Sequence, residues 1–276
     1  MDTMAMNHQE HFWQYQEHTI HAIQFGEGAK LLLAFHGYGD SCELFLKLEP
    51  SLAKHYTVIA IDLPYHGQTA WQASHFSPQD IVKLVEFILN KQTQTNFSLL
   101  AYSMGGRFPL AIYNSFQNQI ERIFFVASAG FQPTLAYNKW LFPGWIRRFL
   151  RWVVRKPNWI AKFFYLGHKV GLLNASTYHV FERQLKSEEH RQRLFNIWVA
   201  FYKFPIQLKK FKQYVLQQQL PIHFFYGDKD KITSAHWGDK FVKDIPTATL
   251  DITKGNHFFI RKHLDPFLDE WLSTFQ

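Results

Sequence analysis

The sequence predicts an α/β protein in which a mostly parallel sheet is flanked by helices and interrupted by an inserted helical segment. Apolar, strand-like runs alternate with amphipathic stretches over residues 31–127, and this alternation is typical of parallel sheets with helical crossovers. Two more strand-like runs, 222–226 and 248–252, follow a long interruption. With 276 residues, 47% of them hydrophobic, the chain can bury a large core, and general disorder is excluded.

The elements of the first half follow one another in a regular order. We expect an antiparallel hairpin at 12–16 and 19–25. The parallel strands expected after it are 31–35, 57–61, 97–100 and 120–127. Helices are expected near 42–55 and from Ser77-Pro78 to Lys91, where the proline suits a first helical turn. A third helix follows the strand at 97–100, and Pro109 must lie in its opening turns.

The interruption at 131–219 is expected to be a helical cap, and residues 1–130 and 220–276 are expected to form the core. Residues 131–170 hold eight lysines and arginines and no acid, which accounts for the net charge of +8. On a helical wheel one arc is basic and the opposite arc is apolar. The basic arc consists of Arg147, Arg148, Arg151 and Arg155, and the apolar arc of Trp145, Phe149, Trp152 and Val153.

Three interpretations of this basic segment remain open. The first is a cap helix whose aromatic side chains pack on the core and whose arginines are solvated. In the second, the helix makes a peripheral contact with an anionic membrane surface. In the third, one or two of its basic side chains bind an anionic substrate. No nucleic-acid partner is expected, because no recognition motif accompanies the charge.

A serine between small residues at the end of the strand at 97–100 is the strongest signal for chemistry. The segment reads Ala101-Tyr102-Ser103-Met104-Gly105-Gly106. A strand that runs into such a serine and then into a helix is the pattern of a nucleophile elbow, whose tight turn admits only small neighbours. Taken alone, the segment could equally be an ordinary strand–helix turn.

Two downstream segments supply an acid and a histidine in the order Ser103, Asp230, His257. The run 222–226 ends in Gly227-Asp228-Lys229-Asp230, and the run 248–252 is followed by Gly255-Asn256-His257. All three residues come just after a predicted strand. This chain order belongs to one of the three serine hydrolase templates and differs from the other two. The sequence therefore predicts a catalytic triad.

A glycine-rich turn after the strand at 31–35 is the candidate oxyanion hole. It reads His36-Gly37-Tyr38-Gly39. Acyl transfer requires N–H donors aimed at the developing oxyanion. We expect these donors to be the backbone N–H groups of Tyr38 and of Met104, the residue after the nucleophile. By itself the turn could simply end the strand.

Together these motifs resemble the α/β-hydrolase superfamily over nearly the whole chain. The turn at His36-Gly37, the elbow, Gly227-x-x-Asp230 and Gly255-x-His257 carry the resemblance, as does Asp62-Leu63-Pro64-Tyr65-His66-Gly67, where the family usually has glycine in place of Tyr65. The resemblance implies that the acid is Asp230, three residues after Gly227. Asp228 is then expected to stabilise the turn.

Within the superfamily, the elbow from Tyr102 to Arg107 resembles that of the succinyl-hydroxycyclohexadiene carboxylate synthases of the menaquinone pathway. In those enzymes the arginine four residues after the serine binds a substrate carboxylate, and Arg107 occupies this position. A solvent-facing or salt-bridged helix residue is the alternative for Arg107. The candidate substrate-binding residues are His36, Gly37, Tyr102 and Arg107.

We expect a serine hydrolase that acts on an ester-type small-molecule or lipid-like substrate, either anionic or acyl-containing. Ser103 would attack the carbonyl, His257 would transfer the proton and Asp230 would orient His257. One alternative is the pyruvate-eliminating synthase, in which Ser103 and His257 would act on a proton. A second alternative is a non-catalytic ligand receptor or membrane-associated module on the same scaffold.

No cofactor or metal is expected from the motifs. The pairs His8-x-x-His11 and His18-x-x-His21 lack cysteine or carboxylate partners in sequence. Gly26-x-Gly28 precedes a strand, so it does not match a dinucleotide fingerprint. The polar N-terminus, the absence of a long apolar run and the single cysteine, Cys42, lead us to expect a cytoplasmic protein.

Overall fold

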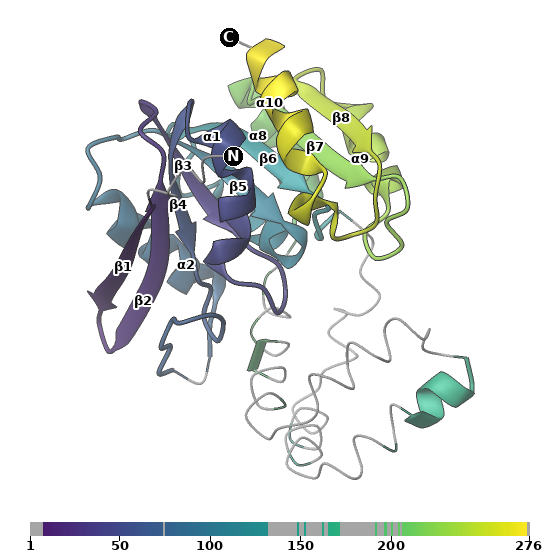
Figure 1. Cartoon of the computed structure of the whole chain (residues 1–276), viewed down its shortest axis with the longest axis horizontal. Helices are drawn as coiled ribbons and strands as arrows, with labels where there is room; N and C mark the ends of the chain where they lie inside the picture. Colours follow the sequence, from purple (N-terminus) through teal and green to yellow (C-terminus); the bar gives the residue numbers. More distant parts are fainter. Residues whose placement is uncertain are drawn as a thin grey trace, which may run out of the picture. The chain divides into compact units, whose positions relative to one another are not determined.

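The fold was obtained as a computed structural model of the 276-residue chain (Figure 1). It describes residues 8–73, 75–131, 148, 152, 162, 165–171, 191, 196–197, 200, 204 and 206–274. The chain divides into two compact units, one formed by 73–77 and 133–203 and the other by the remainder. The second of these is the core unit, and it holds all the strands described below.

The core unit is built on an eight-stranded sheet with the order β1-β2-β4-β3-β5-β6-β7-β8. β1 pairs antiparallel with β2, β2 pairs antiparallel with β4, and all other neighbours are parallel. The strands are β1 (His8–Tyr15), β2 (His18–Phe25), β3 (Lys30–Phe35), β4 (Tyr56–Ile61), β5 (Phe97–Tyr102), β6 (Ile120–Val126), β7 (Ile222–Gly227) and β8 (Ala248–Thr253). The predicted mostly parallel sheet is therefore confirmed.

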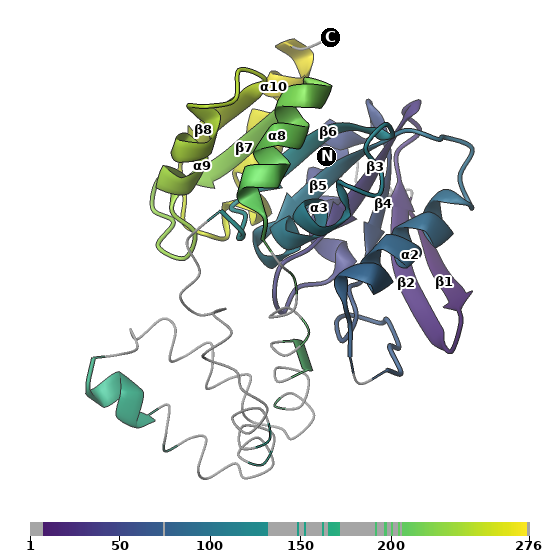
Figure 2. The same cartoon turned by 180° about the vertical axis from the view of Figure 1, so that it is seen from behind.

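Helical segments cover both faces of this sheet. Figure 1 shows α1 and α10 on one face, and Figure 2 shows α2, α3 and α8 on the other. The described helical elements are η1 (Cys42–Leu48), α1 (Glu49–Leu52), α2 (Pro78–Leu89), η2 (Ser103–Gly106), α3 (Arg107–Ile112), α8 (Leu208–Gln218), α9 (Ala235–Val242), η4 (Phe259–Arg261) and α10 (Leu264–Thr274). No helix among the described residues is both long and apolar enough to span a membrane.

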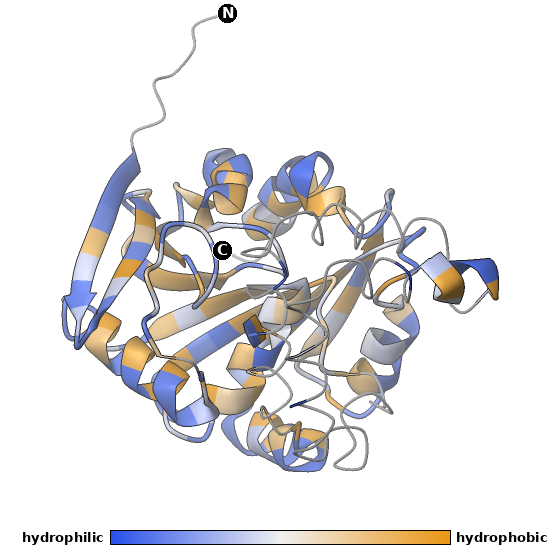
Figure 3. Cartoon of the chain, turned by 90° about the horizontal axis from the view of Figure 1, so that it is seen from below, coloured by the Kyte–Doolittle hydropathy of each residue, from blue (hydrophilic) through white to orange (hydrophobic). Residues whose placement is uncertain are grey.

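Burial follows the strand patterns. Every residue of β5 and β7 is buried, as expected for strands covered on both faces. An apolar cluster packs the sheet against η1, α1 and α10, and it includes Leu32, Leu100, Phe124 and Trp271. Figure 3 shows hydrophobic residues concentrated on the central strands, whereas the edge strand β1 is largely hydrophilic.

One of the expected helices differs from the observed ones. The single helix expected near 42–55 is a 3₁₀ segment, η1, followed by the short helix α1. Pro50 lies in the first turn of α1, where its missing N–H is tolerated, so the proline begins a new helix instead of continuing the previous one. Pro109 is the third residue of α3, within the opening turn, as predicted.

The expected cap boundary at residue 219 differs from the division of the chain into units. The core unit resumes at Phe204, so α8 belongs to it. The reason is its apolar stripe: Phe211, Tyr214 and Val215 are buried, and the Phe211 ring lies 5.9 Å from that of Phe241. A helix with this i, i+3, i+4 spacing presents one apolar side, which here packs on a face of the sheet (Figure 2).

The basic arc falls mostly outside the described residues. Arg147, Arg151, Arg155, Trp145, Phe149 and Val153 all lie outside them. Arg148 and Trp152 are described, and both side chains are exposed, Trp152 by 47%. The three interpretations of this segment therefore stay as predictions.

Candidate active site

Ser103 lies directly after β5, at the edge of the sheet where the parallel strands end. Its φ of +51° is in the left-handed region, which costs a non-glycine residue on the order of 1–3 kcal/mol. The turn is tight, since a Cβ at Gly105 would lie 2.2 Å from the carbonyl oxygen of Phe35 and one at Gly106 would lie 2.7 Å from that of Ala129. The small residues are therefore required, and the serine side chain is only partly buried.

His257 lies between Ser103 and Asp230. The Ser103 hydroxyl donates to His257 Nε2 across 2.8 Å. His257 Nδ1–H donates to Asp230 Oδ2, also across 2.8 Å. Because the carboxylate accepts at Nδ1, the lone pair of Nε2 faces the serine, as a general base requires. The structure thus brings together all three residues predicted as the triad.

Tyr102 makes two contacts with His257. The Tyr102 hydroxyl donates to the carbonyl of His257 across 3.1 Å, and the two ring centroids lie 5.5 Å apart. Tyr102 is 1% exposed. Its side chain therefore supports the loop that carries His257.

Asp230 is held by four donors. Its Oδ1 accepts the backbone N–H groups of Ile232 and Thr233 at 2.8 and 2.9 Å. Its Oδ2 accepts from His257 and lies 2.8 Å from the hydroxyl of Thr233. Burial alone would raise the pKa of Asp230, but the hydrogen bonds and charge of His257, together with the bonds from Thr233, hold that pKa below its ordinary value.

The expected oxyanion turn lies against the nucleophile. A Cβ placed on Gly37 would lie 3.0 Å from the Cβ of Ser103. Tyr38 follows Gly37, and Met104 is the second residue of η2, where backbone N–H groups have no partner within the helix. Both residues are partly buried. The turn can therefore present amides to a group bound at Ser103.

An ion pair ties this turn to the segment after His257. Arg261 of η4 donates to Asp40 Oδ1, and the Asp40 side chain is 10% exposed. Burial raises the pKa of Asp40, and the charge of Arg261 partly offsets this. The loops on either side of Ser103 are thereby joined.

The expected substrate-binding roles of His36 and Tyr102 need correction. His36 is fully buried. Its Nδ1–H donates to the carbonyl of Gly37 at 2.7 Å, and its Nε2 accepts the N–H of Leu63 at 3.1 Å. Burial lowers the pKa of His36 and so favours the neutral ring. His36 and Tyr102 hold backbone in place and present no side-chain group to a substrate, and the buried Gly37 contributes only backbone.

Arg107 begins α3, one turn after Ser103, and it is 4% exposed. This burial is incompatible with the solvent-facing alternative. Arginine is rarely this buried unless its guanidinium is paired. The position remains suited to holding an anionic group, and that role is a proposal.

The sequence analysis missed Thr233. Its side chain is 4% exposed and lies beside both Asp230 and His257. The only local signal is a hydroxyl residue three positions after the acid, which by itself is common in turns.

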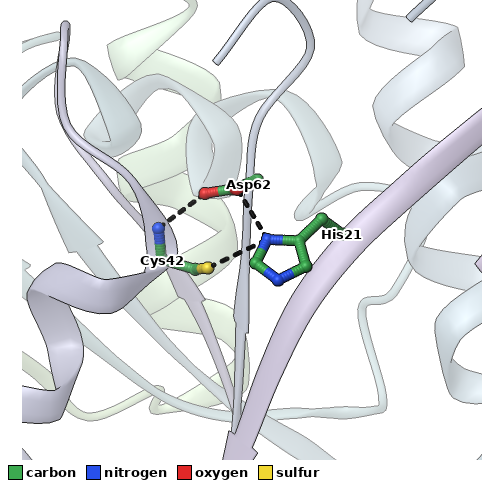
Figure 4. Close-up of side chains that lie close together, drawn as sticks. All are labelled: His21, Cys42 and Asp62. Atoms are coloured by element: carbon green, nitrogen blue, oxygen red, sulfur yellow. Dashed lines mark hydrogen bonds and ion pairs between the residues drawn. The ribbon is translucent and has the colours of Figure 1, made fainter. Parts of the chain in front are cut away.

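One group of three potential metal ligands occurs among the described residues, namely His21, Cys42 and Asp62 (Figure 4). Their hydrogen bonds explain it without an ion. Asp62 accepts from His21 Nδ1–H, the Cys42 N–H and the Gln68 N–H, each at 2.7 Å. Burial, followed by the charge of Asp62, raises the pKa of the Cys42 thiol, which disfavours the thiolate that a metal needs. The cluster joins β2, η1 and the loop after β4.

Comparison with known families identifies the fold. The model of the alpha/beta hydrolase fold matches residues 30–263, which include the Ser103, Asp230 and His257 segments. The chain belongs to the alpha/beta hydrolase family. It is a hydrolytic enzyme of this fold, and the resemblance of its motifs to the superfamily is confirmed.

Relatives of this hydrolase share modest identity. An uncharacterized hydrolase of Bacillus subtilis, YugF, is 24% identical over 236 residues, which cover 81% of each chain. A probable serine hydrolase of Drosophila melanogaster is 31% identical over 121 residues, 42% of this chain and 36% of that protein. The structure of a putative lipase from Acinetobacter baumannii is similar with a TM-score of 0.67 at 20% identity, covering 97% of this chain and 91% of the lipase. This last likeness establishes the fold alone.

Proposed function

We propose that this hydrolase cleaves ester-type acyl substrates through a covalent intermediate on Ser103. The observation that carries the proposal is the unbroken chain of hydrogen bonds from Ser103 through His257 to Asp230, with 2.8 Å at each step. Distances of this size lie within the range needed for proton transfer between a nucleophile and its base.

The reaction follows from this arrangement. As the Ser103 oxygen attacks the ester carbonyl, His257 Nε2 takes its proton, and the negative charge moves to the carbonyl oxygen. The N–H groups of Tyr38 and Met104 stabilise this oxyanion, by about 2.7–4 kcal/mol for each donor. The tetrahedral intermediate collapses, His257 protonates the departing alcohol, and the acyl group stays on Ser103. Water, activated by His257, then releases the acid.

Asp230 supports both proton transfers without giving up a proton. Its lowered pKa keeps it ionised while His257 becomes positively charged. The carboxylate then stabilises the imidazolium and keeps Nε2 directed at Ser103. Thr233 and Ile232 supply the hydrogen bonds that keep this carboxylate in place.

We further propose that the substrate is a small acyl-containing molecule with an anionic group near Arg107. The support is the position of Arg107 at the start of α3, four residues after the nucleophile, which is where the menaquinone-pathway synthases that the elbow resembles bind a substrate carboxylate. Replacement of Arg107 by glutamine is expected to raise KM for an anionic ester more than for a neutral one.

Covalent labelling tests the proposal directly. A fluorophosphonate should modify the native protein at Ser103, and Ser103→Ala should abolish both the labelling and the turnover of nitrophenyl acetate. Labelling that persists in the alanine variant would disprove the assignment. Absence of both labelling and turnover in the native protein would likewise contradict the proposed ester cleavage at Ser103.

A second candidate function is pyruvate elimination. It is favoured by the position of Arg107, four residues after Ser103, because the elbow resembles that of the menaquinone-pathway synthases. In this reaction His257 and Ser103 would remove a proton and no acyl-enzyme would form. Pyruvate release from the synthase substrate, with no turnover of nitrophenyl esters, would decide for this candidate.

A further inference from the structure

Thr233 occupies an unusual position between the acid and the histidine of the proposed triad. Its hydroxyl oxygen lies 2.8 Å from Asp230 Oδ2, 3.2 Å from His257 Nδ1 and 2.9 Å from the carbonyl oxygen of Ala127. The residue lies in the loop between β7 and α9 and is 4% exposed. A buried hydroxyl with three polar neighbours is held in place, because moving it would leave buried polar groups without a partner.

We propose that Thr233 is a positioning residue of the hydrolase, which sets the plane of the Asp230 carboxylate and fixes the distance between Asp230 and His257. This inference rests on the proposed function of the triad. It adds a fourth side chain, which acts on the reaction only through Asp230 and His257.

The two oxygens of Asp230 are fixed in different ways. Oδ1 accepts the two backbone N–H groups of Ile232 and Thr233, which belong to the same loop as the acid. These bonds restrain Oδ1, whereas the position of Oδ2 also depends on contacts of its own. Oδ2 is hydrogen-bonded to the Thr233 hydroxyl and to His257. The hydroxyl therefore keeps Oδ2 in line with Nδ1 while the histidine gains and loses a proton.

Thr233 also connects three strand ends. Its contact with Ala127 reaches the residue after β6, Asp230 follows β7, and His257 follows β8. Ala127 has a φ of +44°, in the left-handed region, which strains a residue with a Cβ. In this conformation its carbonyl oxygen accepts a hydrogen bond from the Thr233 hydroxyl. The Thr233 hydroxyl contacts Ala127, Asp230 and His257. The distance between the acid and the histidine therefore depends on the end of β6 as well as on the loops after β7 and β8.

The single hydroxyl proton has two acceptors, Asp230 Oδ2 and the carbonyl of Ala127. When it is donated to Asp230, part of the carboxylate charge is neutralised. The carboxylate then stabilises an imidazolium less strongly. Removal of the hydroxyl should leave more of the negative charge for the contact between Asp230 and His257, so the pH–rate profile of the hydrolase should change.

The test compares three variants of the full-length protein. Thr233→Val keeps the shape and the backbone N–H but removes the hydroxyl, and Thr233→Ser restores the hydroxyl. Thr249→Val is the matched control, because the Thr249 hydroxyl contacts Nδ1 of a different histidine, His223, at 2.8 Å. For each we would measure kcat and KM for nitrophenyl acetate, the pH–rate profile, thermal unfolding and the proton NMR signal of the His257 Nδ1–H.

For Thr233→Val we expect kcat to fall by about tenfold or more with little change in KM, as for the loss of a hydrogen bond to a charged group. The pH–rate profile should differ from that of the native protein, and the Nδ1–H signal should shift or broaden. Thr233→Ser should recover most of the activity. Thr249→Val should leave the profile and the signal unchanged, whatever its effect on unfolding.

Two results would overturn the inference. One is a Thr233→Val protein with the native pH profile and Nδ1–H signal, and the other is a serine variant as impaired as the valine variant. Either result leaves the proposed function intact as long as Ser103→Ala abolishes labelling. A native protein without Ser103-dependent labelling or turnover overturns the proposed function and this inference together.

Discussion

At the scale of single residues, Asp228 and Asp230 both follow β7, but they have different hydrogen-bond partners and therefore different roles. Asp228 is exposed, and its Oδ1 accepts the N–H of Gly255 at 2.8 Å. Asp230 is inaccessible to solvent and receives four hydrogen-bond donors, one of them His257. The first carboxylate therefore joins the loop after β7 to the loop after β8, and the second is available to orient the histidine.

This difference predicts unequal effects of the same substitution. Asp230→Asn should lower kcat on the order of 10³–10⁴-fold, since an amide favours the wrong tautomer of His257. Asp228→Asn keeps an acceptor for Gly255 and should lower kcat by less than about tenfold. Steady-state kinetics with nitrophenyl acetate measures both. The reverse ranking would mean that the acid is misplaced.

At the scale of elements, α8 ends in a complete Schellman motif without glycine. Leu220 N–H donates to the carbonyl of Val215 at 3.0 Å, and Gln219 N–H donates to that of Leu216 at 3.4 Å. These are the two hydrogen bonds that define the motif. Gln219 has a φ of +50°, a conformation that costs a residue with a Cβ on the order of 1 kcal/mol.

Gln219→Gly should therefore stabilise the protein. We expect the free energy of unfolding to increase by about 0.5–1 kcal/mol, after the loss of the side-chain bond to Leu216 is taken into account. The control is Gln217→Gly, an exposed position inside the same helix, where glycine should destabilise by about 0.5–1 kcal/mol. Denaturant unfolding measures both, and a destabilised Gln219→Gly variant would contradict the strain argument.

At the scale of the whole molecule, the parallel sheet separates the triad, which follows the C-terminal ends of the strands, from core residues such as His223 near the start of β7. Ser103, Asp230 and His257 all follow the C-terminal ends of strands, which meet at one edge. His223 is the second residue of β7, 4% exposed, and its ring packs 4.2 Å from that of Trp271. This histidine is therefore a core residue.

The burial of His223 predicts how the free energy of unfolding depends on pH. Burial, and secondly the charge of Arg122, lower the pKa of His223 to about 3, whereas the unfolded value is near 6.5. Below about pH 6.5 the unfolded chain binds a proton that the folded protein excludes. The contribution of His223 to the free energy of unfolding is therefore fully present above about pH 6.5. It decreases by about 1.4 kcal/mol per pH unit as the pH falls to about 3.

His223→Gln should flatten this dependence, because glutamine does not titrate. Chemical unfolding between pH 7 and about pH 4 would show a smaller loss of stability for the variant than for the native protein. The exposed His263 offers a matched control, and His263→Gln should leave the slope unchanged. Identical slopes for the native protein and His223→Gln would contradict the prediction.

The basic arc gives a prediction about the surface of the molecule. We expect Arg147, Arg148, Arg151 and Arg155 to be mainly solvated, so replacing all four by glutamine should not change turnover of a soluble ester. Bound to anionic lipid, each would contribute about 1 kcal/mol. Sedimentation with phosphatidylserine vesicles at physiological salt measures this, and tight binding of the native protein would indicate a lipid substrate instead.

The sequence by itself determined the parallel sheet, the order of its strands along the chain and the candidate triad. These features have local signals: continuous apolar runs predict buried strands, and a serine among glycines predicts a turn that a bulky residue would block. Because parallel strands end at one edge, the pattern predicts an acid after the run 222–226 and a histidine after the run 248–252, and the resemblance to the family selects Asp230 over Asp228. The structure brings these side chains into contact with Ser103.

Only the tertiary structure decided which neighbouring side chains face the triad and which are buried. His36 and Tyr102 lie in the expected motifs, yet both are buried and hold backbone, because their partners at Leu63 and His257 are distant in sequence. The contacts of Thr233 with Ala127 and His257 likewise span 106 and 24 residues. Such contacts leave no periodic or local trace, since they form only when several strand ends are packed together.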